Sequence, residues 1–207
     1  MRQYLVLVML SALLSACALL SKPAPAPELY MLKPDPAAAA AETLPLTIRI
    51  ALPEVAPGLD TARIAVLEAD NKLIYYTGAA WAAPLPQLAQ EFLSDAFGRS
   101  RAFRIAGSDQ EPLRTDVMLS TAIHECQVDM SGPQPVIRLR LTATLLNSET
   151  HQALAAIPVE ETVQAEANHM AALVAAFNKA FNAAAQTIIP AAAQAARAAE
   201  SQREEMP

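Results

Sequence analysis

Residue types on which enzymes and cofactor sites depend are scarce in this chain of 207 residues, which has five glycines, three histidines and two cysteines. The sequence contains no G-x-S-x-G, H-E-x-x-H or C-x-x-C motif and no glycine-rich phosphate loop. Acidic residues outnumber basic ones by 21 to 15. Such a surface has no overall electrostatic attraction for nucleic acid or anionic lipid headgroups, so the composition favours neither an enzyme nor a nucleic-acid-binding protein.

One cluster, His124-Glu125-Cys126, has the residue types of a catalytic or metal site. Alternate side chains of a regular strand share a face, so we expect His124 and Cys126 on one side and Glu125 on the other. A zinc site needs further ligands, and a cysteine nucleophile needs an activating base. We therefore predict a buried, inert Cys126 and no catalytic, cofactor-binding or metal-binding residue. An enzyme that uses Cys126 is the alternative.

The N-terminus has the pattern of an export signal. Arg2 is the only charge in the first 21 residues and precedes the apolar run Tyr4–Leu14. That run is shorter than the roughly 20 apolar residues of a membrane span. It leads into Leu14-Ser15-Ala16-Cys17, which resembles the lipobox of bacterial lipoproteins. The pattern predicts a signal peptide over residues 1–16 and lipidation of Cys17 by diacylglycerol and an N-acyl chain such as palmitate. An ordinary secretory signal with a chance cysteine is the alternative.

Two consequences follow from lipidation of Cys17. Cys126 then has no partner for an intrachain disulfide. Residues 17–28 become a lipidated tether, and their alternating prolines favour an extended chain that reaches roughly 35 Å. Ala18, rather than aspartate, follows the cysteine. That resembles lipoproteins sent on to the outer membrane in enteric-type bacteria, so we expect an anchor in the periplasmic face of the outer membrane.

Hydrophobic periodicity predicts one α+β domain over residues 29–189: a mixed, mostly antiparallel sheet with two main helices packed on one face. A Pro/Ala loop at 33–43 precedes the main strands. Pro84 and Pro86 open the first helix and Gly98 ends it, whereas Asn168 caps the second and Pro190 interrupts it. Residues 190–207 are predicted to be an alanine-rich tail, either helical or disordered. The expected strands lie at 29–32, 46–52, 64–67, 73–76, 103–105, 116–128, 136–146 and 153–163.

Alternation along 136–146 places Arg138, Arg140, Thr142 and Thr144 on the outer face of their strand. Two interpretations remain open for this face, a contact surface for a partner subunit or a solvated strand face. The alanine-rich tail has the same two possibilities, a partner-binding helix or a loose end.

Several local patterns together suggest a family. Tyr30-Met31-Leu32 follows the tether, Gly58–Ile64 leads into a strand, and Asn71–Tyr76 forms a hairpin arm. Trp81-Ala82-Ala83-Pro84-Leu85 then opens the first helix. Over Tyr30–Ile189 the chain resembles the ABC-type transport auxiliary lipoproteins, the family that includes paraquat-inducible protein C. Ala83 stands where that family often has an acidic residue.

The resemblance implies an accessory part of a transporter that moves lipids or other hydrophobic molecules between the inner and outer membranes. The implied partners are a substrate-binding subunit of the mammalian-cell-entry (MCE) type and, through it, an ABC permease and ATPase. The resemblance also implies that the lipoprotein docks the far end of the transport path, in a homo-oligomeric ring if it oligomerises. A scaffold lipoprotein of the envelope without a direct transport role is the alternative.

Overall fold

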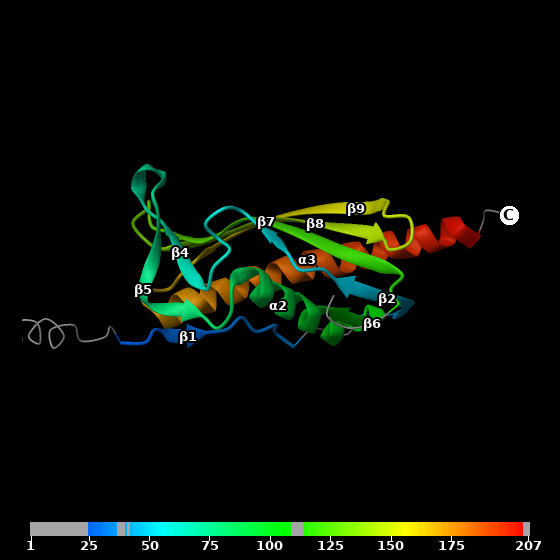
Figure 1. Ribbon diagram of the computed structural model, residues 1–207, viewed down its shortest axis with the longest axis horizontal. Helices are drawn as coiled ribbons and strands as arrows, with labels where there is room; N and C mark the ends of the chain where they lie inside the picture. Colours follow the sequence, from blue (N-terminus) through cyan, green and yellow to red (C-terminus); the bar gives the residue numbers. More distant parts are fainter. Residues whose placement is uncertain (1–24, 37–39, 41, 109–113, 205–207) are drawn as a thin grey trace, which may run out of the picture.

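The computed structural model describes residues 25–36, 40, 42–108 and 114–204, in which two long helices lie along one side of a curved sheet (Figure 1). The α+β fold expected from the sequence is therefore confirmed. The strands are β1 (Glu28–Tyr30), β2 (Leu44–Ile50), β3 (Glu54–Val55), β4 (Arg63–Leu67), β5 (Leu73–Trp81), β6 (Phe103–Ser108), β7 (Val117–Asp129), β8 (Val136–Asn147) and β9 (Ala153–Gln164). The helices are η1 (Ala69–Asn71), α2 (Leu85–Ser100) and α3 (Met170–Glu204).

Strand β7 organises the sheet. One of its edges pairs with β8, which pairs in turn with β9, and these two longest ladders are both antiparallel. The other edge of β7 meets β2, β3 and β4 in succession, each in parallel. Strand β6 extends the sheet from β2, while β5 and then β1 extend it from β4. The sheet therefore forks on one side of β7 and continues as a regular antiparallel meander on the other.

The helices cover the inner face of the sheet because both present an apolar stripe to it. The members of the α3 stripe that are fully buried include Leu173, Phe177, Phe181, Ala184 and Ile188. The ring of Trp81 meets that of Phe177 edge-on at 5.1 Å between centroids, and Phe92 of α2 meets Phe181 of α3 at 5.3 Å. Edge-to-face pairs of this kind add to the burial of apolar area, so the aromatic contacts lock β5 and α2 onto α3.

The structure corrects two predicted helix ends. Gly98 lies inside α2, which ends at Ser100 with Arg101 in the left-handed region at φ 53°. At the start of α3, the backbone N–H of Ala172 bonds to His169 Nδ1 at 3.3 Å, whereas the side chain of Asn168 accepts a hydrogen bond from the Tyr76 hydroxyl. The side chain of His169 therefore caps the helix, a role that was predicted for Asn168.

The prediction that Pro190 interrupts the second helix was wrong, because α3 continues through it to Glu204. Proline removes one backbone hydrogen bond from the helix, but packing of the residues that follow Pro190 offsets that loss. Ala192 and Ala196 are fully buried beyond the proline. Ion pairs also hold this last part of the helix: Arg197 lies 3.0 Å from Glu42, and Arg203 lies 3.9 Å from Glu149. No helix among the described residues combines the length and the apolar character needed to cross a membrane.

Asparagines of α3 hold the start of the predicted Pro/Ala loop. Asn178 Oδ1 accepts a hydrogen bond from the backbone N–H of Lys33 at 2.9 Å, and Asn182 Oδ1 accepts one from that of Asp35 at 2.8 Å. The amide of Asn182 also donates to the Lys33 carbonyl at 3.2 Å. These bonds link the entry of the chain into the domain to the first half of α3, although about 145 residues separate the partners.

Candidate docking surface

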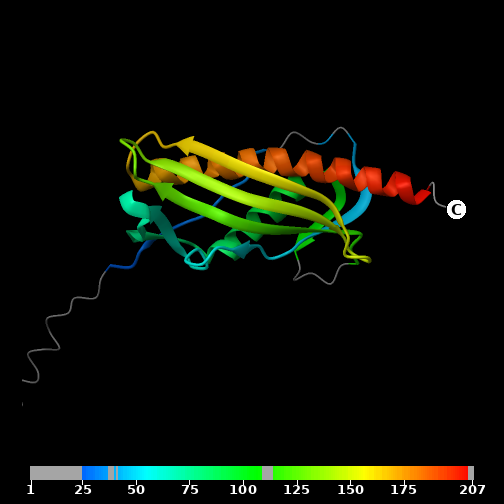
Figure 2. The same ribbon diagram turned by 90° about the horizontal axis from the view of Figure 1, so that it is seen from above.

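The outer face of β7, β8 and β9 is a long surface that neither α2 nor α3 covers (Figures 1 and 2). The predicted alternation along β8 is confirmed. Ile137, Leu139, Leu141, Ala143 and Leu145 point inward and are buried, whereas Arg138 and Arg140 are exposed and Thr142 and Thr144 are partly exposed. The strand therefore divides cleanly into a face for the core and a face for the outside.

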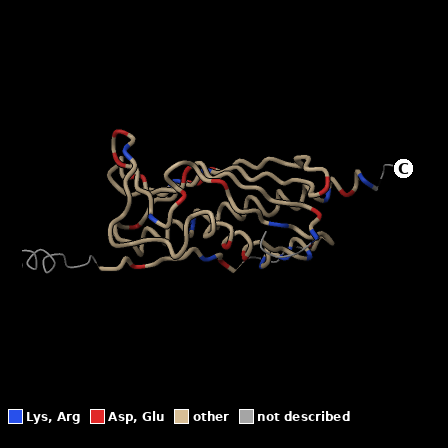
Figure 3. Tube along the Cα trace, in the orientation of Figure 1, with Lys and Arg blue, Asp and Glu red and all other residues tan. Residues whose placement is uncertain are grey.

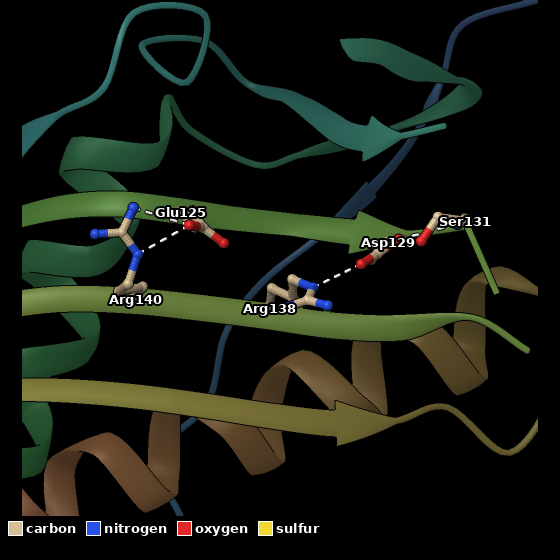
Figure 4. Close-up of polar contacts among 5 residues, drawn as sticks. All are labelled: Glu125, Asp129, Ser131, Arg138 and Arg140. Carbon is tan, nitrogen blue, oxygen red and sulfur yellow. Dashed lines mark hydrogen bonds and ion pairs between the residues drawn. The ribbon is translucent and has the colours of Figure 1, made fainter. Parts of the chain in front are cut away.

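One end of this surface carries two ion pairs between neighbouring strands (Figure 4). Arg138 Nε of β8 lies 2.6 Å from Asp129 Oδ2 of β7, and Arg140 Nη2 lies 2.8 Å from Glu125 Oε1. Asp129 also accepts hydrogen bonds from the hydroxyl of Ser131 at 2.6 Å and from its backbone N–H at 2.9 Å. The two arginines are therefore held flat against the sheet, with their charges locally balanced.

Asp129 has the most strongly hydrogen-bonded charge of this surface. Its side chain is only 8% exposed, and its carboxylate accepts hydrogen bonds from three donors. The Ser131 hydroxyl is the main cause that lowers the pKa of Asp129, followed by the Ser131 backbone N–H and then by Arg138. Hydrogen bonds to the ionised form favour it, and here they outweigh the opposing effect of burial. The same carboxylate raises the pKa of Arg138. Asp129 therefore stays ionised and fixes the turn between β7 and β8.

Small side chains form two rows across the strands, between the charged end and the partly exposed pair Met118 and Leu146 at the other end. Ser120, Thr144 and Ala156 stand opposite one another in the first row, and Ala122, Thr142 and Pro158 in the second. All six side chains in these rows are short, and His124 beside them reaches the Thr142 hydroxyl with its Nε2 at 3.3 Å. We call these six residues the small-residue face. Pro158 lies on the edge strand β9, where its missing N–H opposes the addition of a further strand.

The cluster His124-Glu125-Cys126 is arranged differently from the prediction. The pairing of β7 with β8 shifts between Ile123 and Glu125, so His124 is an extra residue in a β-bulge. A bulge breaks the alternation. His124 and Glu125 therefore both point outward, whereas Cys126 lies on the inner face opposite the buried Leu139. The expectation that His124 and Cys126 share a side was wrong, and sequence periodicity gave no signal of the bulge.

Cys126 is buried, as predicted, and burial raises the pKa of its thiol to about 12. A thiol with such a pKa holds almost no thiolate near neutral pH, so Cys126 has the properties of a structural residue. His124 is exposed and its Nε2 lies 3.3 Å from the Thr142 hydroxyl. Within the described part of the chain, no three His, Cys, Asp or Glu side chains gather closely enough to hold a metal ion.

An open groove of about 460 Å³ runs between the tip of the β4–β5 hairpin and the charged end of the surface. Glu68 and Asp70 of the hairpin line one side, and His124, Glu125 and Asp129 line the other. The hairpin itself was predicted, and its turn residues Asp70 and Asn71 have positive φ, which suits their types. Its position over β7 was not predicted, because it depends on the pairing of β4 with Val128 and Asp129.

The outer face can therefore offer a contact surface: short side chains in the middle of the strands, two ion pairs at one end, and a groove beside that end. The family model for the ABC-type transport auxiliary lipoprotein component matches residues 30–189. The chain belongs to this family. The predicted identification is thereby confirmed. Lipidation at Cys17 stays a prediction, since Cys17 lies outside the described residues.

Two solved structures share the fold of this auxiliary component. Protein XCC0632 from Xanthomonas campestris, of the family DUF330, is similar with a TM-score of 0.71 at 22% identity, over 84% of this chain and 99% of that one. An uncharacterised protein is similar with a TM-score of 0.62 at 14% identity, over 80% of this chain and 97% of that one. No curated protein matches the chain. At such identities the likeness concerns the fold.

Proposed function

We propose that this protein is a non-enzymatic docking component of an MCE-type ABC transporter that moves lipids or other hydrophobic molecules between the inner and outer membranes. Its lipid on Cys17 holds it to the periplasmic face of the outer membrane. There it binds the MCE-type substrate-binding subunit, and through that subunit it is linked to the permease and the ATPase. The observation that carries the proposal is membership of the transport auxiliary family over residues 30–189.

The small-residue face supports a docking role. Protein interfaces are specific when backbones and side chains fit closely, and six small residues in two rows offer a flat area for such a fit. The ion pairs Arg138–Asp129 and Arg140–Glu125 border this area and keep the arginines from folding over it. The area is therefore preorganised, which lowers the entropy lost on binding.

Site-specific photo-crosslinking in envelope membranes tests this function. A photoreactive amino acid replaces Thr142 in the small-residue face, and a matched control replaces Thr187, an exposed threonine on α3. We expect the probe at position 142, and not the one at 187, to crosslink to an MCE-type subunit. Recovery of envelope proteins without any MCE-type subunit or transporter ATPase would support a scaffold role and contradict the proposal.

The anchor and the oligomeric state have tests of their own. Mass spectrometry of residues 17–28 from the purified protein measures the acyl chains on Cys17, and fractionation of inner from outer membranes measures its location. The mass of the detergent-solubilised protein measures whether it forms the homo-oligomeric ring that belongs to this proposal. An unmodified Cys17, or a protein found in the inner membrane, would contradict the proposed anchor in the outer membrane.

A further inference from the structure

Two large hydrophobic side chains are exposed together where the chain enters the domain. Leu29 is 65% exposed and Met31 is 47% exposed. Tyr30 between them packs against the core. Because side chains alternate along an extended chain, Leu29 and Met31 share the side that faces away from the core. Strand β1 therefore has an apolar outer side that nothing within the described part of the chain covers.

The neighbours of this apolar pair are small or charged. Glu28, directly before Leu29, is exposed and accepts a hydrogen bond from the Tyr30 hydroxyl at 2.6 Å. Leu29 stands opposite Ala80 of β5, which in turn stands opposite Arg63 of β4. The guanidinium of Arg63 lies 3.9 Å from the centroid of the Tyr75 ring. Lys33, two residues beyond Met31, is exposed and has no ion pair among the described residues. Two cations, Arg63 and Lys33, and one carboxylate, Glu28, thus lie around the apolar pair, and charges of both signs are seen along this part of the chain (Figure 3).

The position of β1 in the chain suggests what covers it. Leu29 lies 12 residues after Cys17 in the sequence. A chain of that length with alternating prolines reaches about 37 Å, so a lipid on Cys17 keeps β1 within roughly that distance of a bilayer. Tethering makes contact with that bilayer an intramolecular event, so even a weak attraction is populated. Apolar side chains with adjacent cations match the boundary between acyl chains and phosphate headgroups.

We propose that Leu29 and Met31 insert into the headgroup boundary of the bilayer that carries the Cys17 lipid, with Arg63 and Lys33 beside lipid phosphates. This inference rests on the proposed lipid anchor. The contact would seat the domain on the membrane by its β1 end, instead of leaving it free at the full reach of the tether. The end of the molecule that holds β6, which lies far from β1 along the long axis (Figure 1), would then point away from the bilayer.

The experiment uses the full lipidated protein in vesicles of phosphatidylethanolamine and phosphatidylglycerol. An environment-sensitive fluorophore is attached through Met31→Cys, and a matched control carries it through Ile105→Cys on β6, where the native side chain is 41% exposed. The native Cys126 stays in place, since it is buried and does not react. A water-soluble quencher measures exposure of each fluorophore. A second variant adds Leu29→Ser to the Met31→Cys protein.

We expect a blue shift and a several-fold loss of quenching at position 31, no such change at position 105, and recovery of quenching when Leu29→Ser is added. Equal quenching at the two positions, with acylated Cys17 verified by mass spectrometry, would overturn the contact and leave the anchor intact. Shielding at position 31 that rises with the protein-to-lipid ratio would assign the apolar pair to a second copy of the chain and overturn the contact as well. An unacylated Cys17 would overturn both the anchor and the contact.

Discussion

The inner and outer faces of β7, β8 and β9 are formed by alternate side chains of the same strands, but they carry different kinds of interaction. The inner face is apolar and closed by α2 and α3, and Leu139 and Leu145 are entirely buried in it. The outer face carries mostly polar or small side chains, with Met118 and Leu146 at one end, and its two arginines pair with carboxylates of the neighbouring strand. Most of the free energy of folding therefore comes from the inner face. Apart from the hydrogen-bonded Asp129, substitutions on the outer face are expected to cost little stability, so this face can be shaped for a partner.

The largest expected effect is a cavity on the inner face. Leu139→Ala removes a fully buried side chain, so we expect the free energy of unfolding to fall by about 2 to 5 kcal/mol. Thr142→Ala, three residues away on the outer face, is the control and stays within about 0.5 kcal/mol of the native protein. Denaturant unfolding measures both. Similar losses in the two variants would break the comparison between the faces.

Within the outer face, the buried carboxylate of Asp129 is expected to stabilise the fold more than the more exposed carboxylate of Glu125. Asp129→Ala leaves the Ser131 hydroxyl and Arg138 without their acceptor, so we expect a loss of about 1 to 3 kcal/mol. Glu125→Ala removes an ion pair in which both side chains are at least 30% exposed, and costs at most about 1 kcal/mol. Unfolding of the two variants side by side gives the difference. A larger loss at position 125 would contradict it.

The contribution of Asp129 also depends on pH in a defined direction. Its pKa in the folded protein lies below the value of about 3.9 in an unfolded chain. Its stabilisation is therefore complete above that unfolded value and disappears as the pH falls through the folded value. The difference in free energy of unfolding between the native protein and Asp129→Asn is expected to shrink from pH 7 toward pH 2. A difference that grows in acid would contradict this assignment.

The smallest expected effect on stability comes from the small-residue face, where the expected effect is on binding. Thr142→Arg places a long cation on a partly exposed position and changes the free energy of unfolding by no more than about 0.5 kcal/mol. It also blocks close approach of another surface, so recovery of the MCE-type subunit from envelope membranes is expected to drop several-fold. Thr187→Arg on α3 is the control with unchanged recovery. Equal recovery from both variants would remove the small-residue face from the docking role.

The regular parts of the fold could be predicted because local patterns specify them. Period-two alternation located β7, β8 and β9 to within one residue at each end, and the turn residues Asp70 and Asn71 located the β4–β5 hairpin. The bulge at His124 could not be predicted, because an extra residue in a strand leaves no mark in hydrophobic periodicity. The effect of Pro190 on the helix was mispredicted for a similar reason. The burial that stabilises the helix beyond Pro190 comes from elements that are distant in sequence.

The amino-acid sequence by itself determined the class of this protein: its scarcity of catalytic residues, its lipobox pattern at Cys17, its α+β order and the motifs of its transport auxiliary family. The tertiary structure decided how those parts face the outside. Pairing across strands placed Arg138 beside Asp129 and gathered six small residues into one flat area, and the pairing of β1 with β5 left Leu29 and Met31 uncovered. The composition of a surface depends on the tertiary structure because neighbours on a sheet come from distant segments of the chain. The exposure of each residue depends on those neighbours.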